Sequence, residues 1–249
     1  MKRLKEIILG ILVVAVFGSL GVYVYRNEKN RTHKDLAKRI AEVSPRGGPP
    51  ETIDGLKTAI ALYEDQIARN VKEGAQTGVY WKILAVRLAD RSMHRDAVDA
   101  LERAVYYNAE DPAIYYLTGV SAGTVAKSVV GFSANAASER EHFYKLSESA
   151  FLRALELDAL YDKPMYGLGV LYVFELDRAA EAIPYLSRYL EINRSDVSAM
   201  FVLARAHYTA GNYNEAVEYY DRIIVSTKDV KVRAEAQNNK DIVWESMYE

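Results

Sequence analysis

The sequence predicts an all-α protein, with one N-terminal transmembrane helix followed by a solenoid of helical hairpins and a C-terminal capping helix. Three observations predict this class. An uncharged apolar run lies near the N-terminus, apolar residues recur at three and four positions from Ile53 onward, and a pattern repeats at thirty-four residues. The alternation of apolar and polar residues that is typical of β-strands is missing.

Residues 1–25 are expected to be a membrane anchor. Ile7 to Tyr25 carries no charge, and nineteen residues at about 1.5 Å each roughly match the hydrocarbon thickness of a bilayer. Basic residues flank both ends, and the compact basic cluster at the N-terminus favours an N-inside orientation with the remainder translocated. In a bacterium this predicts a single-pass protein of the inner (cytoplasmic) membrane with a periplasmic domain. The alternative is a signal peptide cleaved near Val16 and Gly18.

Residues 26–52 are expected to connect the anchor to the solenoid. The first part of this segment is polar and compatible with a helix, and Ser44 to Pro50 reads SPRGGPP, which stops a helix and predicts a loop.

Residues 53–249 are expected to form the solenoid, with four units at about 78–111, 112–161, 162–196 and 197–228. Tyr115 follows Trp81 by thirty-four positions, and Tyr220 follows Leu186 by the same interval. One hairpin cannot bury its apolar face alone, so the units must stack. Residues 53–73 predict the second helix of a degenerate first hairpin. Residues 229–248 predict a capping helix with Val232, Ile242 and Trp244 turned inward.

The repeat resembles the tetratricopeptide repeat (TPR) family over about residues 78–228. The matching segments are Met165-x-x-Leu168-Gly169-x-x-Tyr172 and Gly211-x-Tyr213-x-x-Ala216-x-x-x-Tyr220. The closing proline of the family pattern is replaced by Ala109, Ala159 and Arg194, which weakens the turn signal. The resemblance implies a right-handed α-solenoid that binds other proteins, and it implies no chemistry.

The second unit is irregular. Ala104 and Ala154 lie fifty positions apart instead of thirty-four, so sixteen residues are inserted between its two helices. Ser138 to Glu141 has the pattern of a capping box, which predicts that a helix restarts there after a loop near Gly131 to Ala137. The insertion is either padding without a role, a protruding contact element, or a lid over the groove. The contact candidates in it are Phe132, Asn135 and His142.

Composition argues against several function classes. A formal net charge of −2 gives no overall attraction for phosphate backbones, which argues against nucleic-acid binding. The chain has no cysteine, which excludes disulfides, thiolate metal sites and a thiol nucleophile. Glu139 and His142 share a helical face, but the second such pair that a di-iron site needs is absent. We therefore expect no catalytic residues, no metal and no cofactor.

The resemblance places a binding groove on the concave face, along the first helix of each hairpin. No asparagine accompanies Lys82 at the matching positions, so a clamp for a C-terminal carboxylate is not expected. The remaining aromatic strip suits an apolar peptide or amphipathic helix with acidic residues, unless the tyrosines pack between helices or the insertion fills the groove. The groove candidates are Lys82, Val86, Tyr116, Val120, Tyr166, Val170, Val173, Phe201, Arg205 and Tyr208.

The functional prediction is a membrane-tethered scaffold or adaptor without catalysis. Its place would be an envelope-associated assembly for motility, secretion, pilus formation or outer-membrane assembly. The main alternative is an accessory subunit or chaperone that delivers clients to a transporter or translocon. A cytosol-facing targeting receptor requires the opposite orientation of the anchor. Homo-oligomer formation through the convex face or the insertion is a further alternative.

Overall fold

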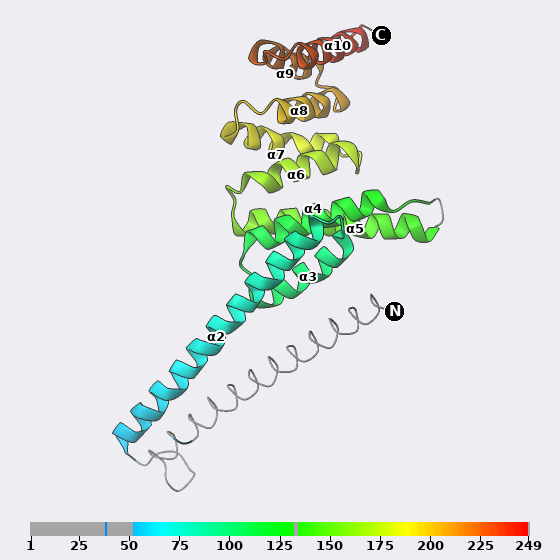
Figure 1. Cartoon of the computed structure of the whole chain (residues 1–249). Coiled ribbons are helices and arrows are strands. Elements are labelled where there is room, and N and C mark those ends of the chain that lie inside the picture. Colours follow the sequence, from blue (N-terminus) through cyan, green and yellow to red (C-terminus); the bar gives the residue numbers. More distant parts are fainter. Residues whose placement is uncertain (1–37, 39–51, 132–133, 249) are drawn as a thin grey trace, which may run out of the picture. The chain divides into compact units, whose positions relative to one another are not determined.

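The computed structural model describes residues 38, 52–131 and 134–248, and these residues contain helices but no strand. The all-α prediction is therefore confirmed for the described residues (Figure 1). The helices with their bounds are α2 (Ile53–Ala89), α3 (His94–Tyr107), α4 (Pro112–Ser128), α5 (Ala134–Leu157), α6 (Asp162–Phe174), α7 (Ala179–Ile192), α8 (Val197–Thr209), α9 (Tyr213–Ser226) and α10 (Val230–Ser246).

The predicted anchor, Ile7 to Tyr25, lies outside the described residues, as does nearly all of the linker that follows it. No helix within the described ranges is long and apolar enough to span a bilayer. The membrane anchor therefore stays a prediction from sequence.

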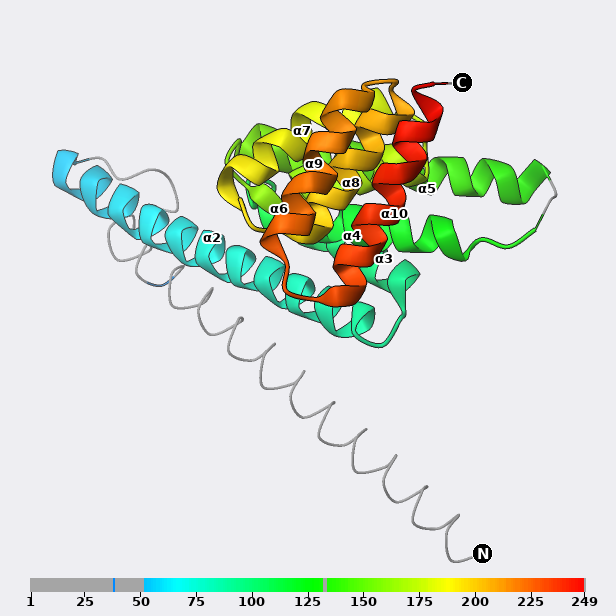
Figure 2. The same cartoon turned by 90° about the horizontal axis from the view of Figure 1, so that it is seen from above.

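The chain divides into two compact units, residues 1–73 and residues 74–249. In the second unit, α4 with α5, α6 with α7, and α8 with α9 form three antiparallel hairpins, and α10 packs against α9 (Figures 1 and 2). Successive hairpins stack in the order of the sequence, as expected where each unit buries its apolar face against its neighbours.

Helix α2 is unbroken from Ile53 to Ala89, so the predicted end of a helix at residue 73 is wrong. The intervening GAQTG contains two glycines, each of which costs a helix only about 1 kcal/mol relative to alanine. Gly78 lacks a side chain where a Cβ would lie 2.8 Å from Asn108 Cγ. Asn108 Nδ2 also donates to the carbonyl of Ala75 at 3.1 Å. Gly78 allows close packing against the end of α3, and neither glycine makes a turn.

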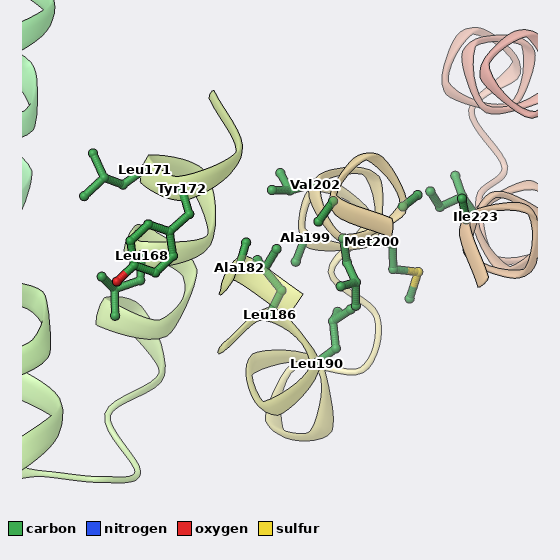
Figure 3. Close-up of a cluster of buried hydrophobic side chains, with 14 of the residues drawn as sticks. Leu168, Leu171, Tyr172, Ala182, Leu186, Leu190, Ala199, Met200, Val202 and Ile223 are labelled. Atoms are coloured by element: carbon green, nitrogen blue, oxygen red, sulfur yellow. The ribbon is translucent and has the colours of Figure 1, made fainter. Parts of the chain in front are cut away.

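Two apolar clusters form the core of the second unit. The larger extends from Ala126 on α4 to Val243 on α10 (Figure 3), and it includes fully buried leucines of three successive helices. Those leucines are Leu168, Leu186 and Leu203, and each contributes about 1.5–3 kcal/mol by leaving water. The smaller cluster joins α2, α3 and the start of α4 around Leu101 and Ile114.

Aspartates at three turns begin the following helices. Asp111 Oδ1 accepts from Ala113 N at 2.9 Å, and Asp196 Oδ1 accepts from Ala199 N at 3.0 Å. Asp229 Oδ1 accepts from Lys231 N at 2.8 Å. Each bond satisfies an N–H that the first helical turn leaves without a partner. N-cap hydrogen bonds therefore define these turns. At Asp196 the cap forms although Arg194 replaces the closing proline of the family pattern.

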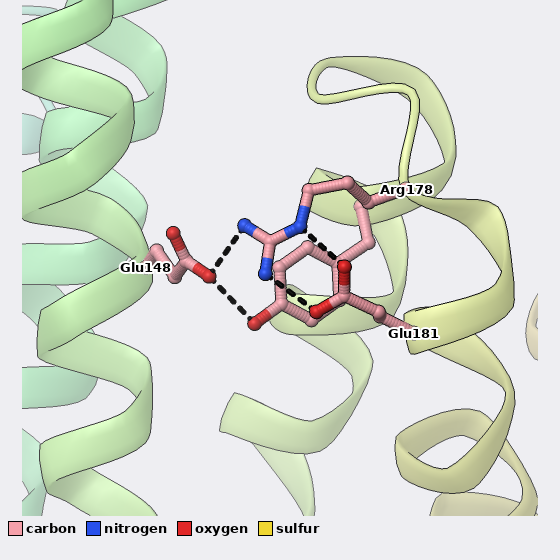
Figure 4. Close-up of polar contacts among 4 residues, drawn as sticks. Glu148, Arg178 and Glu181 are labelled. Atoms are coloured by element: carbon pink, nitrogen blue, oxygen red, sulfur yellow. Dashed lines mark hydrogen bonds and ion pairs between the residues drawn. The ribbon is translucent and has the colours of Figure 1, made fainter.

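A cluster of charged side chains and one tyrosine joins the α4–α5 hairpin to the α6–α7 hairpin (Figure 4). Glu148 Oε1 on α5 accepts from Tyr172 OH on α6 and from Arg178 Nη1 in the α6–α7 turn, both at 2.8 Å. Arg178 also pairs with Glu181 on α7, and its guanidinium lies 4.6 Å from the centroid of the Tyr172 ring. The arginine thereby links three helices through partly buried contacts.

The insertion forms the outer ends of α4 and α5, which protrude beyond the neighbouring hairpins (Figure 2). Helix α5 begins at Ala134, so the predicted restart at Ser138 is four residues too late. Alanines before Ser138 are strong helix formers and extend the helix backward. Near its start, α5 contacts α3, because Arg95 pairs with Glu139 at 2.7 Å and lies 5.0 Å from the Phe143 ring centroid.

The capping helix α10 packs through a different stripe from the one predicted. Ala236 and Val243 are buried and Val232 is half-buried, whereas Ile242 and Trp244 are exposed. Residues 232, 236 and 243 share one helical face, and Ile242 and Trp244 lie on either side of it. The inward prediction for these two residues is therefore wrong.

Candidate binding groove

The structure divides most of the predicted groove residues between two cavities. One lies between α4, α5 and α6, has a volume of about 270 Å³, and is lined by Tyr116, Val120, Tyr166 and Val170 among others. We call it the α4–α6 cavity. The second, the cap cavity, has a volume of about 280 Å³ and is lined by Phe201, Arg205 and Tyr208 together with residues of α10. Lys82, Val86 and Val173 line neither of these two cavities.

Glycines open the α4–α6 cavity. Gly119 and Gly123 on α4 and Gly167 on α6 line it, and the Phe151 ring of α5 lies beneath them. A Cβ at Gly119 would lie 2.5 Å from that ring, and one at Gly167 would lie 2.7 Å from it. Because side chains are absent there, a residue of a second helix reaches the groove. Sequence reasoning missed these residues, although the spacing Gly119-x-x-x-Gly123 places two glycines on one helical face.

The tyrosines of the α4–α6 cavity pack between helices and also line it. The Tyr116 ring centroid lies 6.2 Å from that of Phe151 and 5.5 Å from that of Tyr161. The Tyr166 ring centroid lies 5.3 Å from that of Tyr189. Burial raises the pKa of Tyr116 and of Tyr166 above the ordinary value, with nearby carboxylates adding to the shift, so both hydroxyls are protonated at neutral pH.

Charged groups lie at the two ends of α6. Beyond its C-terminal end, Glu175 accepts from Tyr144 OH at 2.5 Å and pairs with Lys127 Nζ at 2.9 Å. Burial raises the pKa of Glu175, but the hydrogen bond from Tyr144 and the Lys127 ammonium outweigh it, and the net pKa lies below its ordinary value. At the N-terminal end, Lys163 Nζ lies 5.8 Å from the Tyr116 ring centroid. Lys163 forms no ion pair with another described residue, so it leaves positive charge beside the apolar wall.

Lys82 is a partner of Asp111. The Lys82 ammonium lies 2.5 Å from Asp111 Oδ2, while the other oxygen of that carboxylate caps α4. This geometry makes Lys82 a support of the α3–α4 turn. Val86 is exposed on α2, and Val173 is half-buried against the larger core cluster.

In the cap cavity, α10 forms one wall. Arg205 lies 5.4 Å from the Phe174 ring centroid, and Phe201 lies 6.1 Å from the Tyr220 ring centroid. Tyr208 OH and Ser246 Oγ are hydrogen-bonded at 3.0 Å. Helix α10 therefore lines the same cavity as Phe201, Arg205 and Tyr208. The sequence did not predict this contribution of α10.

The described residues of the insertion, 128–131 and 134–143, do not line the α4–α6 cavity. Asn135 and His142 are exposed, and the His142 ring centroid lies 5.3 Å from that of Phe143. Phe132 lies outside the described residues. For the described part, a contact element fits the geometry better than a lid. Within the described ranges, no three histidine or carboxylate side chains are placed to hold a metal ion.

The geometry defines a helical-repeat protein with an apolar groove, and the comparisons specify the repeat. The tetratricopeptide repeat family model matches residues 171–229. A TPR repeat-containing protein of Borreliella burgdorferi is 20% identical over 212 residues, which cover 85% of this chain and 88% of that protein.

Solved structures show the same fold. YrrB, described as a TPR protein with an unusual peptide-binding site, aligns with a TM-score of 0.55 at 20% identity over 73% of this chain and 83% of its own. MamA from residue 41 onward, from Desulfovibrio magneticus RS-1, aligns with a TM-score of 0.54 at 13% identity over 69% and 92% of the two chains. The fold is thus that of TPR proteins, and residues 171–229 match the model of the repeat.

Proposed function

We propose that this chain is a membrane-tethered scaffold that holds a partner protein in the α4–α6 cavity, within an envelope-associated assembly. The observation that carries the proposal is the cavity itself. Glycines expose its floor, half-exposed valines form its rim, and Lys163 adds a positive charge at one end.

The size and chemistry of the cavity favour a peptide ligand. At about 270 Å³ it is slightly smaller than the roughly 300–1,000 Å³ typical of small-molecule sites. Its lining is mainly apolar and aromatic, which suits the side chains that anchor a peptide or an amphipathic helix. An acidic residue beside the anchoring side chains would face Lys163. A partner segment with one or two large apolar residues next to a carboxylate fits this description.

Val120→Glu tests the cavity. Val120 is 40% exposed, so the substitution leaves the core intact while placing a carboxylate on the apolar rim. We expect partner capture, measured by crosslinking in native membranes followed by mass spectrometry, to fall about tenfold or more, as typical for losing an anchor contact. Leu160→Glu is the matched control, because Leu160 is exposed in the α5–α6 turn, outside the lining of the cavity. Equal capture by both folded variants would exclude the cavity.

The same crosslinking separates two kinds of partner. An adaptor comigrates with one complex at fixed stoichiometry, whereas a chaperone that delivers clients yields several substoichiometric partners. Phe201→Ala tests the cap cavity separately, because Phe201 lines that cavity and does not line the α4–α6 cavity, where Tyr116 lies.

The tether is supported by the uncharged run from Ile7 to Tyr25 and by the basic residues before it. A reporter enzyme that is active in only one compartment, fused after Glu249, tests its direction. We expect activity in the periplasm of a bacterial host. Activity in the cytosol would instead support a cytosol-facing receptor.

A further inference from the structure

An apolar stripe of α2 lies exposed in the first compact unit. Five large apolar side chains on this stripe are between 41% and 73% exposed: Ile53, Leu56, Ile60, Tyr63 and Ile67. Their spacing of three and four residues is that of the first and fourth positions of a heptad, which in a coiled coil face a second helix. We call these five residues, with Asn70 at the next heptad position, the α2 seam.

The seam is distinct from the stripe of α2 that is already covered. Ala59 and Leu62 are buried, and they lie about a quarter-turn around the helix from the seam. A helix whose apolar residues extend over both stripes buries both when its partners are present. The seam is therefore the part that remains to be covered.

The charges beside the seam identify an occupant. Lys57 and Glu64 lie one heptad apart on the same edge of the seam, and neither forms an ion pair with the described part of the chain. In an antiparallel helix pair, residues on this edge face residues on the same edge of the other helix. Two copies of α2 can thus match Lys57 with Glu64 twice, once on each side of a twofold axis.

We propose that two copies of this chain associate through the α2 seam as an antiparallel pair. Ile60 packs against Tyr63 of the second copy, and Leu56 packs against Ile67. Ile53 and Asn70 form the outermost layers. Lys57 of each copy faces Glu64 of the other. This interface is separate from the α4–α6 cavity and does not rest on the proposed function.

Other arrangements match less well. A parallel pair places Glu64 opposite Ala59 and Val71 opposite Gln66, which gives no attraction between charges. An antiparallel pair shifted by one heptad places Lys57 opposite Lys57 or Glu64 opposite Glu64, which is repulsive. Only the proposed register among these buries the seam and pairs opposite charges.

The seam spans eighteen residues from Ile53 to Asn70, or about 27 Å of helix. This length is shorter than the roughly three to four heptads of a free-standing coiled coil, so we expect association that depends on protein concentration. Confinement to a membrane surface would raise the local concentration and favour the pair.

Charge reversal tests the register in the full chain. We expect Lys57→Glu alone and Glu64→Lys alone each to raise the dimer Kd about tenfold, and the double variant to restore the value of the unaltered chain. Sedimentation of the detergent-solubilised chain measures the Kd. Lys72→Glu is the matched control on the outward face of α2 and leaves the Kd unchanged. A chain that stays monomeric, or a double variant no better than the singles, would overturn the proposal.

Cysteine crosslinking tests the same register independently, because the natural chain contains no cysteine. Ile60→Cys chains mixed with Tyr63→Cys chains should form disulfide-linked dimers on mild oxidation faster than either variant alone. Ala61→Cys mixed with Ala68→Cys, exposed outside the seam, serves as the control. Faster linkage within each single variant would indicate a parallel pair and refute the antiparallel one.

Discussion

His207 is a buried imidazole on α8 with 9% of its surface exposed. Its ring stacks on Tyr219 with centroids 5.6 Å apart, and its Nδ1 lies 3.4 Å from Asn212 Nδ2. Burial lowers the pKa of His207, and the opposing effect of Glu215 and Glu218 is smaller. The folded protein therefore holds this histidine neutral under conditions where the unfolded chain begins to protonate it.

This difference predicts a loss of stability on mild acidification. Because the folded pKa is below the unfolded value of 6.5, the unfolded state binds the proton first, and the free energy of unfolding falls as the pH drops below about 6.5. Urea unfolding at pH 7.5, 6.5 and 5.5 measures the fall. His207→Gln should remove this part of the pH dependence, whereas His142→Gln, at an exposed position, should keep it. An unchanged pH dependence in His207→Gln would contradict the assignment.

The excess of tyrosine over phenylalanine, 19 against 6, has a physical explanation in the structure. Several buried or half-buried tyrosines donate to carboxylates across helix junctions. Tyr172 donates to Glu148, and Tyr189 donates to Asp196 at 2.7 Å. A phenylalanine would fill the same space but remove one of the hydrogen-bond donors to the partly buried carboxylate. The hydrogen-bond partners of these tyrosines depend on the arrangement of the hairpins and were not readable from sequence.

Within an element pair, glycine sets how closely two helices approach. At Gly169 a Cβ would lie 2.3 Å from Leu186 Cδ2, so α6 and α7 meet without a side chain between them. The repeat spacing placed this glycine and this leucine in one predicted unit, residues 162–196. Here the sequence and the structure agree, because the contact lies within one repeat.

Gly169→Ala should therefore lower the free energy of unfolding by about 1–3 kcal/mol through overpacking. Gly74→Ala is the comparison, since Gly74 lies inside α2 and a Cβ there would lie 3.9 Å from Tyr107, an ordinary contact. That change should raise stability by about 0.5–1 kcal/mol, because alanine favours a helix over glycine. Thermal or urea unfolding of the two variants measures the change in the free energy of unfolding, which should be negative for Gly169→Ala and positive for Gly74→Ala. Equal effects would show that packing does not distinguish the two positions.

Predicted helix ends agree with the structure where an aspartate caps the next helix, and they are wrong within α2 and α5. Asp111 and Asp196 cap helices close to the boundaries expected from the repeat. Gly74 and Gly78 lie inside α2, and Ser138 lies inside α5. A glycine pair or a capping pattern indicates only a local preference for ending or starting a helix. Packing on neighbouring helices decides whether the helix continues.

At the scale of the whole molecule, the stack followed from the repeat, whereas the groove followed only in part. The repeat register placed Tyr116, Val120, Tyr166 and Val170 on the lining of one cavity. It treated first helices as the sole lining, and so omitted Phe151 of α5. That ring reaches the cavity because two glycines remove the side chains in its way, a contact between elements that no single repeat encodes. The role of these residues in binding stays a prediction.

The division of the core into two clusters has a mechanical consequence. Of the six buried residues in the smaller cluster, four are alanines, so its apolar area is small, and burial energy scales with that area. A tether at the N-terminus would apply load through α2, and α2 belongs to this smaller cluster. Under tension the first contacts to yield would be those of α2 and α3, while the leucine-rich hairpins behind them keep their fold. If the chain is tethered as proposed, its weakest joint would then be in the smaller cluster, and the cavity proposed to hold the partner lies in the larger one.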